Sequence, residues 1–353
     1  LEAAVAMAGG SGDCALEARL RSRLALELYF SPFPERRREL MQTALRLAAT
    51  SGDAGARAWV ANARLVTDWD VADARERLAH ADVAIAAAVD VGERDLELRA
   101  RAFRVLDLVE LGDLAGWQQE IERYARVVAV HRLPVHESML GTLRIMTALW
   151  LGRYAEAEAM CAQQLAEAER WEDPHARVSV YVQILALRFA RGGAEELLPL
   201  VRAAAEQADA RPEAVAAFAL LLRAAGQDDE ARRIYAALAA EDFRDLDRDR
   251  HLMSTIAWLV DLACDYGSAS QLQALRAYLV PLGGSSLQLV SRLCHGPSEH
   301  YLGLVQTALG DPREGLRLQR IALARCEAAR GRPAAVRIRV AMARCLAAIG
   351  PTE

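Results

Sequence analysis

Residues 152–157 read Gly-Arg-Tyr-Ala-Glu-Ala, and the same turn recurs as Gly-Gln-Asp-Asp-Glu-Ala at 226–231 and Gly-Asp-Pro-Arg-Glu-Gly at 310–315. Each glycine follows an apolar run of helical periodicity, the usual place for a left-handed C-terminal cap. The glutamate then falls early in a second helix, where it suits the positive end of the helix dipole. The small residue after it lets two helices approach closely. The motif therefore predicts a helical hairpin with a tight turn.

The glycine turn repeats along the chain. It occurs at Gly112, Gly152, Gly192, Gly226, Gly267, Gly310 and Gly350. A second kind of turn lies between the hairpins and is marked by proline, which is favoured just inside the start of a helix. These prolines are Pro134, Pro174, Pro212 and Pro333. In an earlier hairpin Trp69-Asp70 replaces the glycine turn. A single hairpin cannot bury its own apolar faces, so stacked neighbours must supply the core. We predict an all-α fold, a right-handed α-α superhelix (TPR-like solenoid) of about eight hairpins with a repeat near 40 residues and one unpaired helix near 333–349.

No linker divides the chain, so residues 1–353 are expected to form one helical repeat domain. The rhythm breaks at Pro281-Leu-Gly-Gly-Ser-Ser286 and Cys294-His-Gly-Pro297, which predicts a bend near 281–297. The chain lacks an initiator Met and ends at Glu353, where the partner of the last helix would begin. We therefore expect it to be a piece of a longer protein.

The charge and composition exclude several classes of protein. All 43 basic residues are arginine, against 48 acidic residues, which gives a net charge of −5. Without lysine the chain cannot form a Walker A phosphate loop or a Schiff base. A weakly acidic chain is also a poor nucleic-acid binder. The longest apolar run, Ala214 to Leu222, is too short to cross a membrane. We expect neither direct nucleic-acid binding nor membrane insertion.

The six cysteines point to a reducing, cytoplasmic compartment. They are Cys14, Cys161, Cys264, Cys294, Cys326 and Cys345, and none forms a C-x-x-C pair. Cys161, Cys326 and Cys345 lie among alanines and leucines at helical spacing, which predicts buried thiols. Structural disulfides would be unusual in such a chain.

Catalytic and metal-binding motifs are missing from the sequence. It contains no H-E-x-x-H, G-x-S-x-G or G-x-G-x-x-G. His131 and His136 lie on either side of one turn, and His295 and His300 flank Pro297, but neither pair has an identifiable third ligand. We therefore expect no enzyme activity, no metal and no cofactor.

The turn at 152–157 resembles that of tetratricopeptide (TPR) repeats, although the repeat is longer than the usual one. The stretches Arg23-Leu-Ala-Leu-Glu-Leu-Tyr-Phe-Ser-Pro-Phe-Pro-Glu-Arg-Arg-Arg38 and Tyr301-Leu-Gly-Leu-Val-Gln-Thr-Ala-Leu-Gly-Asp311 resemble the C-terminal helical region of multidomain actinobacterial signalling regulators. In that family an AAA-type or STAND-type ATPase, sometimes with a cyclase domain, precedes the repeats, and a LuxR-type domain follows in some members. The resemblance implies the sensor or scaffold portion, because neither an ATPase motif nor a LuxR segment is present here.

Arginines on the first helices of three successive hairpins are the candidate binding residues. We aligned the repeats on their turn glycines, so that equivalent positions of the first helices form columns. These columns are mostly apolar, but they also contain Arg101, Arg104, Arg144, Arg188 and Tyr181. First helices of such solenoids commonly line the concave face, where stacked arginines could hold a carboxylate or phosphate bidentately. Alternatively, these arginines pair with acids such as Glu97 or Asp107 as structural bridges, or extend their charged groups to solvent.

Apolar residues beside the arginines suggest a second part of the same site. Met146 and Trp150 could line a groove for a helix or a small ligand. Methionine and tryptophan at helical spacing are more often ordinary core residues, and this interpretation stands beside the first.

Two functions from different classes follow from these patterns. The first is a non-catalytic interaction and ligand-sensing module that binds a peptide, another domain of its parent protein, or a small effector on its concave face. The second is a structural scaffold that self-associates. It predicts an exposed apolar surface on the last helix, around Val336, Val340 and Leu346, and with it an oligomer.

Overall fold

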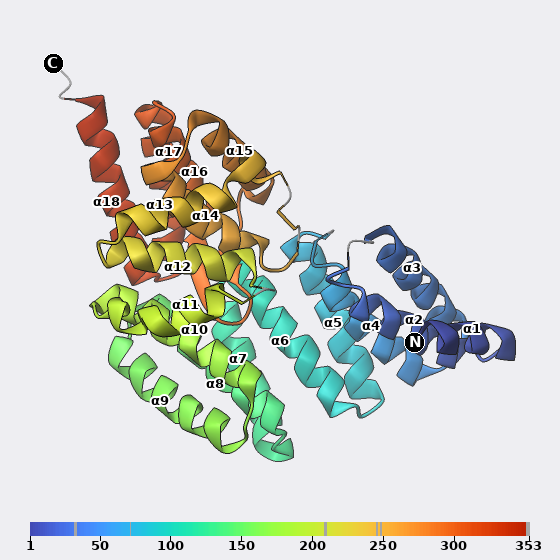
Figure 1. Ribbon diagram of the computed structural model, residues 1–353. Coiled ribbons are helices and arrows are strands. Elements are labelled where there is room, and N and C mark those ends of the chain that lie inside the picture. The colour runs from blue at the N-terminus through green and yellow to red at the C-terminus, as the bar shows by residue number, and fades with distance from the viewer. Residues whose placement is uncertain (32–33, 71, 208–209, 245, 248, 351–353) are drawn as a thin grey trace. The chain divides into compact units, whose positions relative to one another are not determined.

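The computed structural model describes residues 1–350 apart from 32–33, 71, 208–209, 245 and 248. The described residues form 18 α-helices, three short 3-10 helices and one two-stranded sheet, so the all-α prediction is confirmed (Figure 1). Two positions of the N-terminal stretch that carries the family resemblance, 32 and 33, and the chain end at Glu353 lie outside the described residues.

The helices belong to two compact units, one made of residues 1–108 and 115–140 and the other of 109–114 and 141–353. The first unit contains α1 (Glu2–Ser11), α2 (Cys14–Glu27), α3 (Pro34–Thr50), α4 (Ala54–Thr67), α5 (Ala74–Asp90), most of α6 (Arg94–Leu111), α7 (Leu114–His131) and the start of α8 (Pro134–Leu151). The second contains the rest of α8, α9 (Tyr154–Arg170), α10 (Pro174–Arg191), α11 (Leu198–Ala205), α12 (Pro212–Ala224), α13 (Asp228–Leu238), α14 (Leu252–Tyr266), α15 (Ala269–Leu279), α16 (Ser298–Ala308), α17 (Pro312–Ala328) and α18 (Arg332–Ile349).

Helices that follow one another along the chain pack as pairs, which is consistent with an α-solenoid. The hand of the superhelix, the number of repeats and the single-domain organisation stay predictions. Among the described residues, no helix combines the length and the apolarity needed to cross a membrane.

The predicted left-handed cap is wrong at Gly192 and Gly350, whose ψ values of 163° and 169° lie outside the left-handed helical region. Six of the seven predicted turn glycines nevertheless have a positive φ: Gly112, Gly152, Gly192, Gly226, Gly310 and Gly350. Gly267 is the exception, with φ −81° and an extended conformation. A Cβ atom there would lie 2.7 Å from Ala263 O and 2.8 Å from Tyr235 Oη, so this glycine is needed for close approach. The next residue, Ser268, already caps α15.

The rest of the turn motif is also confirmed. The small residues Ala157 and Ala231 are fully buried. A Cβ atom on Gly315 would overlap Thr307 Oγ1 and lie 3.0 Å from Gly303 O, so α16 and α17 touch closely at this glycine. The predicted prolines all lie in the first turns of their helices, α8, α10, α12 and α18. Cys161, Cys326 and Cys345 are buried thiols.

The 281–297 segment contains strands that periodicity did not reveal. The antiparallel strands β1 (Ser286–Leu289) and β2 (Leu293–Pro297) follow η3 (Val280–Leu282), the last of three 3-10 helices after η1 (Ala194–Leu197) and η2 (Ala240–Phe243). The residues of β1 are 0–3% exposed, so this strand is part of the interior of the second unit, whereas the first three residues of β2 are half-buried. Whether the helical stack bends here stays a prediction.

Candidate functional site

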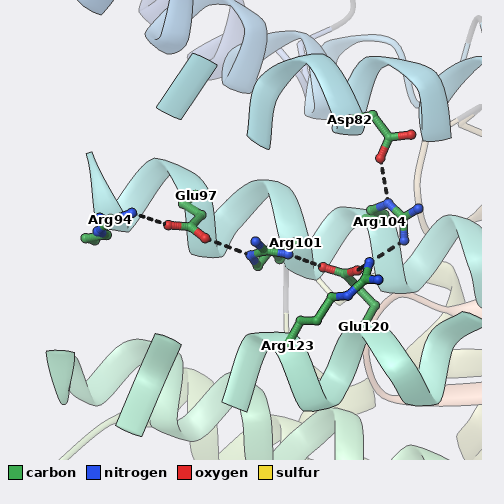
Figure 2. A network of polar contacts seen from close by, with 7 residues as sticks. All are labelled: Asp82, Arg94, Glu97, Arg101, Arg104, Glu120 and Arg123. Atoms are coloured by element: carbon green, nitrogen blue, oxygen red, sulfur yellow. Dashed lines mark hydrogen bonds and ion pairs between the residues drawn. The ribbon is translucent and has the colours of Figure 1, made fainter. Parts of the chain in front are cut away.

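Two of the predicted arginines lie on α6 in a network of ion pairs (Figure 2). Arg101 donates from Nε to Glu97 Oε1 at 2.9 Å and from Nη1 to Glu120 Oε1 at 2.7 Å. Arg104 donates to Asp82 Oδ1 at 2.7 Å and to Glu120 Oε2 at 3.1 Å. The alternative of structural bridges thus fits both arginines. Asp107, the other suggested partner, instead accepts from Arg77 at 2.8 Å.

Glu120 on α7 is the centre of this network. Its side chain is 1% exposed, and it accepts from Arg101, Arg104 and Arg123, the last at 3.2 Å. A buried carboxylate is strongly destabilising unless it is paired, which explains why three guanidinium groups meet it. Burial alone would lower the pKa of Arg101, but the hydrogen bonds it donates to Glu120 and Glu97 raise that pKa above its usual value.

An open groove of about 420 Å³ lies between α6 and α7, next to this network. Its lining consists of Arg94, Glu97, Arg101, Arg123, Arg126, Val127, Val130 and His131. The α6 residues are spaced 94, 97 and 101, and the α7 residues 123, 126, 127, 130 and 131, so each set follows one face of its helix. The groove is therefore built by two facing helical stripes of one hairpin.

Buried hydrogen bonds hold the helices around the groove together. Tyr124 Oη lies 2.7 Å from His136 Nδ1, and His136 Nε2 lies 2.9 Å from Asp95 Oδ1. The chain of contacts links α7, α8 and α6. Burial raises the pKa of Tyr124 far above its usual value, so the phenol stays a hydrogen-bond donor. The contact gives His136 a structural role.

The other five predicted residues belong to the second unit. Met146 and Trp150 on α8 are 1% and 5% exposed, and Trp150 Nε1 donates to Ala329 O at 2.7 Å, as expected for core residues. Arg144 is exposed on α8, and Tyr181 is half-buried on α10. Arg188 lies 3.8 Å from Glu158. The structure does not gather these five side chains into one described cavity.

First helices of the second unit contact the chain's own β-hairpin segment. Gln183 on α10 donates to Arg292 O at 3.0 Å, and Arg292 Nε donates to Ser179 Oγ at 3.0 Å. Ser254 on α14 lies 2.8 Å from His295 Nε2. The surfaces that could line a concave groove in this unit are thus partly covered by residues 292–295.

Among the histidines of the second unit, His300 is buried and His295 is half-buried. Burial, together with a smaller contribution from nearby Arg337, lowers the pKa of His295 to about 3. Its partner Ser254 is 0% exposed, so this serine–histidine contact is closed to a substrate. His300 hydrogen-bonds Gln319 Oε1 at 2.8 Å. Within the described part of the chain, no three His, Cys, Asp or Glu side chains are placed to hold a metal.

Sequence reasoning found Arg101 but missed the rest of the groove. Arg123, Arg126 and Val130 recur at helical spacing on a second helix. That spacing could have indicated the groove face of this helix, but the alignment compared only first helices. Arg94 was missed because it lies seven residues before Arg101, beyond those columns. No protein-family model matches the chain, and no similar curated protein was found.

Proposed function

We propose that this chain is a non-catalytic binding module of a larger bacterial signalling or transcriptional regulator. Its partner is a peptide, a domain of the parent protein or a small effector. The TPR-like turn at 152–157 and the two actinobacterial-type stretches support the assignment to such a regulator. A cytoplasmic location is part of the proposal and is supported by six free cysteines.

The observation that carries this proposal is the cationic groove between α6 and α7. Four arginines line it beside a single glutamate, in a chain whose net charge is −5. Such a local reversal of charge favours an anionic partner, both by steering its approach and by hydrogen bonding. Arginine is the suitable residue, because its planar fork binds carboxylate and phosphate groups bidentately.

Binding is favoured over chemistry by the environment of the groove. Its titratable groups are three arginines held by carboxylates, the exposed Arg126, one glutamate and an exposed histidine, His131. General acid–base catalysis needs a group whose proton moves near neutral pH and a partner that positions it. Arginine does not supply such a proton, and Glu97 holds Arg94 and Arg101 at 2.8 and 2.9 Å.

The scaffold alternative is favoured by one separate observation. Val336, Val340 and Leu346 on α18 are 59%, 50% and 52% exposed, as that hypothesis requires. Exposed apolar side chains at this spacing on one helix are typical of an association surface. The distinguishing measurement is the mass in solution by light scattering, for the wild type and for V336S/V340S. A dimer that dissociates in this variant would support the scaffold.

The test of the binding function is a selection of random dodecapeptides on the immobilised chain. The same selection is run on R94S/R126S and on the matched control R46S/R57S. All four arginines belong to the first unit, and Arg46 and Arg57 are exposed and lie outside the groove lining. We expect peptides that enrich on the wild type and on the control, but not on the groove variant. Equal enrichment on all three proteins would reject the groove as the binding site, and an absence of enriched peptides would reject an unmodified peptide as the partner.

A further inference from the structure

The groove between α6 and α7 carries an excess of positive charge after its internal ion pairs are counted. Arg94 and Arg101 share Glu97, and Arg101 and Arg123 share Glu120 behind them. Arg126 has no ion pair with any described residue. Four guanidinium groups therefore stand against two carboxylates, so two positive charges are left for a ligand.

Three of the four groove arginines are held in place before a ligand arrives. Each guanidinium has five N–H donors, and Arg101 uses only Nε and Nη1 for its contacts with Glu97 and Glu120. Arg94 and Arg123 each contact a carboxylate through Nη1, while 41% of each side chain stays exposed. Donors that are already oriented lose little conformational entropy on binding, which favours affinity.

The rest of the lining indicates what the charged group is attached to. Val127 and Val130 add an apolar edge, and Val130 is 76% exposed. Among the described residues of the lining there is no Phe, Tyr or Trp, so a nucleotide base would lack the large ring on which bases usually stack. An anion attached to a chain with small apolar side chains fits this lining better than a nucleotide does.

We infer that the groove binds a peptide segment carrying a doubly negative group next to an apolar side chain. A phosphorylated serine or threonine supplies this charge on one residue. Two acidic side chains one helical turn apart supply it as a pair. Both sources share one chemistry, two negative charges presented to oriented guanidinium groups. This inference rests on the proposed binding function and specifies its ligand.

The test uses three peptide libraries with identical randomised flanks around a fixed centre. The centre is phosphoserine in the first, Glu-Ala-Ala-Ala-Glu in the second and Ser-Ala-Ala-Ala-Ser in the third. Pooled affinities are measured by fluorescence anisotropy for the wild type, R94S/R126S and R46S/R57S. We expect at least one dianionic library to bind the wild type at least about tenfold more tightly than the neutral library. The preference should persist in R46S/R57S and be lost in R94S/R126S.

Three results would overturn the inference. They are equal binding of the neutral library, an unchanged preference in R94S/R126S, and an equal loss in the control. The phosphoserine and diglutamate arms separate the two sources of charge. If the dodecapeptide selection finds neutral peptides that require Arg94 and Arg126, the binding function stands and the dianionic ligand is rejected. If neither that selection nor any of the three libraries shows binding that depends on Arg94 and Arg126, the binding function itself fails.

Discussion

Arg101 Nη1 on α6 lies 2.7 Å from Glu120 Oε1 on α7, and this carboxylate also accepts from Arg104 and Arg123. Glu120 is thus an internal anion at the back of the cationic groove (Figure 2). The contact links the two helices that form the groove, and it orients two of the arginines that line it. The stability of this hairpin and the shape of its binding surface therefore depend on the same side chain.

Replacing Glu120 with alanine should destabilise the protein by about 3 kcal/mol, because three partly buried arginines lose their common acceptor. Urea denaturation followed by circular dichroism measures this change. The matched control is Glu122→Ala, an exposed carboxylate on the same helix, whose effect should stay within about 0.5 kcal/mol. Equal effects of the two substitutions would show that the ion-pair network contributes no more to the free energy of unfolding than an exposed carboxylate does.

Gly315→Ala should destabilise the second unit by about 1–3 kcal/mol, since the added methyl group must displace Thr307 or separate α16 from α17. Thermal unfolding gives the measurement. Gly10→Ala in α1 is the control, because a Cβ atom there has no neighbour within 4 Å. That substitution should be neutral or slightly stabilising. A neutral Gly315→Ala would contradict the close helix contact.

Trp150→Phe should lower the free energy of unfolding by about 1–3 kcal/mol, because Ala329 O loses the indole N–H donor. The same variant should bind groove peptides with unchanged affinity, since Trp150 is a core residue of the second unit. Urea denaturation and anisotropy on one preparation give both values. Weaker peptide binding by a stable Trp150→Phe would restore Trp150 as a binding residue.

His300 should make the protein less stable in mild acid. Its pKa is lowered to about 3, chiefly by burial and in part by nearby Arg337, although the hydrogen bond with Gln319 raises it. Between pH 6.5 and 3 the unfolded chain therefore binds the proton and the folded chain does not, so stability falls as the pH falls. From pH 7 to pH 5 this group accounts for a loss of about 2 kcal/mol.

The measurement for His300 compares urea denaturation of the wild type and of His300→Gln at both pH values. The variant should lose about 2 kcal/mol less than the wild type over this interval. The comparison cancels the titration of other groups, which both proteins share. Identical losses in the two proteins would show that His300 is protonated in the folded state.

Much of the fold could be predicted because its signals are local. The turn at 310–315 combines a glycine with positive φ, a first-turn glutamate and a small residue at a close helix contact, and all three features are present. A second glycine series was overlooked. Gly12, Gly52 and Gly92 also have a positive φ, and they follow α1, α3 and α5. Glycine therefore marks turns of the chain beyond those that the predicted series contains.

The strands and the groove could not be predicted from the same signals. Strand β1 is only four residues long and buried along its whole length, so it shows no alternation of apolar and polar residues. The lining of the groove depends on which side of α7 faces α6. That side is set by the rotation of the helix about its own axis, which the sequence gives only approximately. An uncertainty of one residue turns a helix by about 100° and moves Arg126 off the groove face.

The affinity of one selected peptide for the wild type and for R94S/R126S tests the central claim most directly. Isothermal titration calorimetry at two salt concentrations gives this ratio without a label. The groove account predicts at least about a tenfold loss in the variant, and weaker wild-type binding at the higher salt concentration. Unchanged affinity in R94S/R126S, with R46S/R57S as the control, would contradict the claim that partners bind in the groove between α6 and α7.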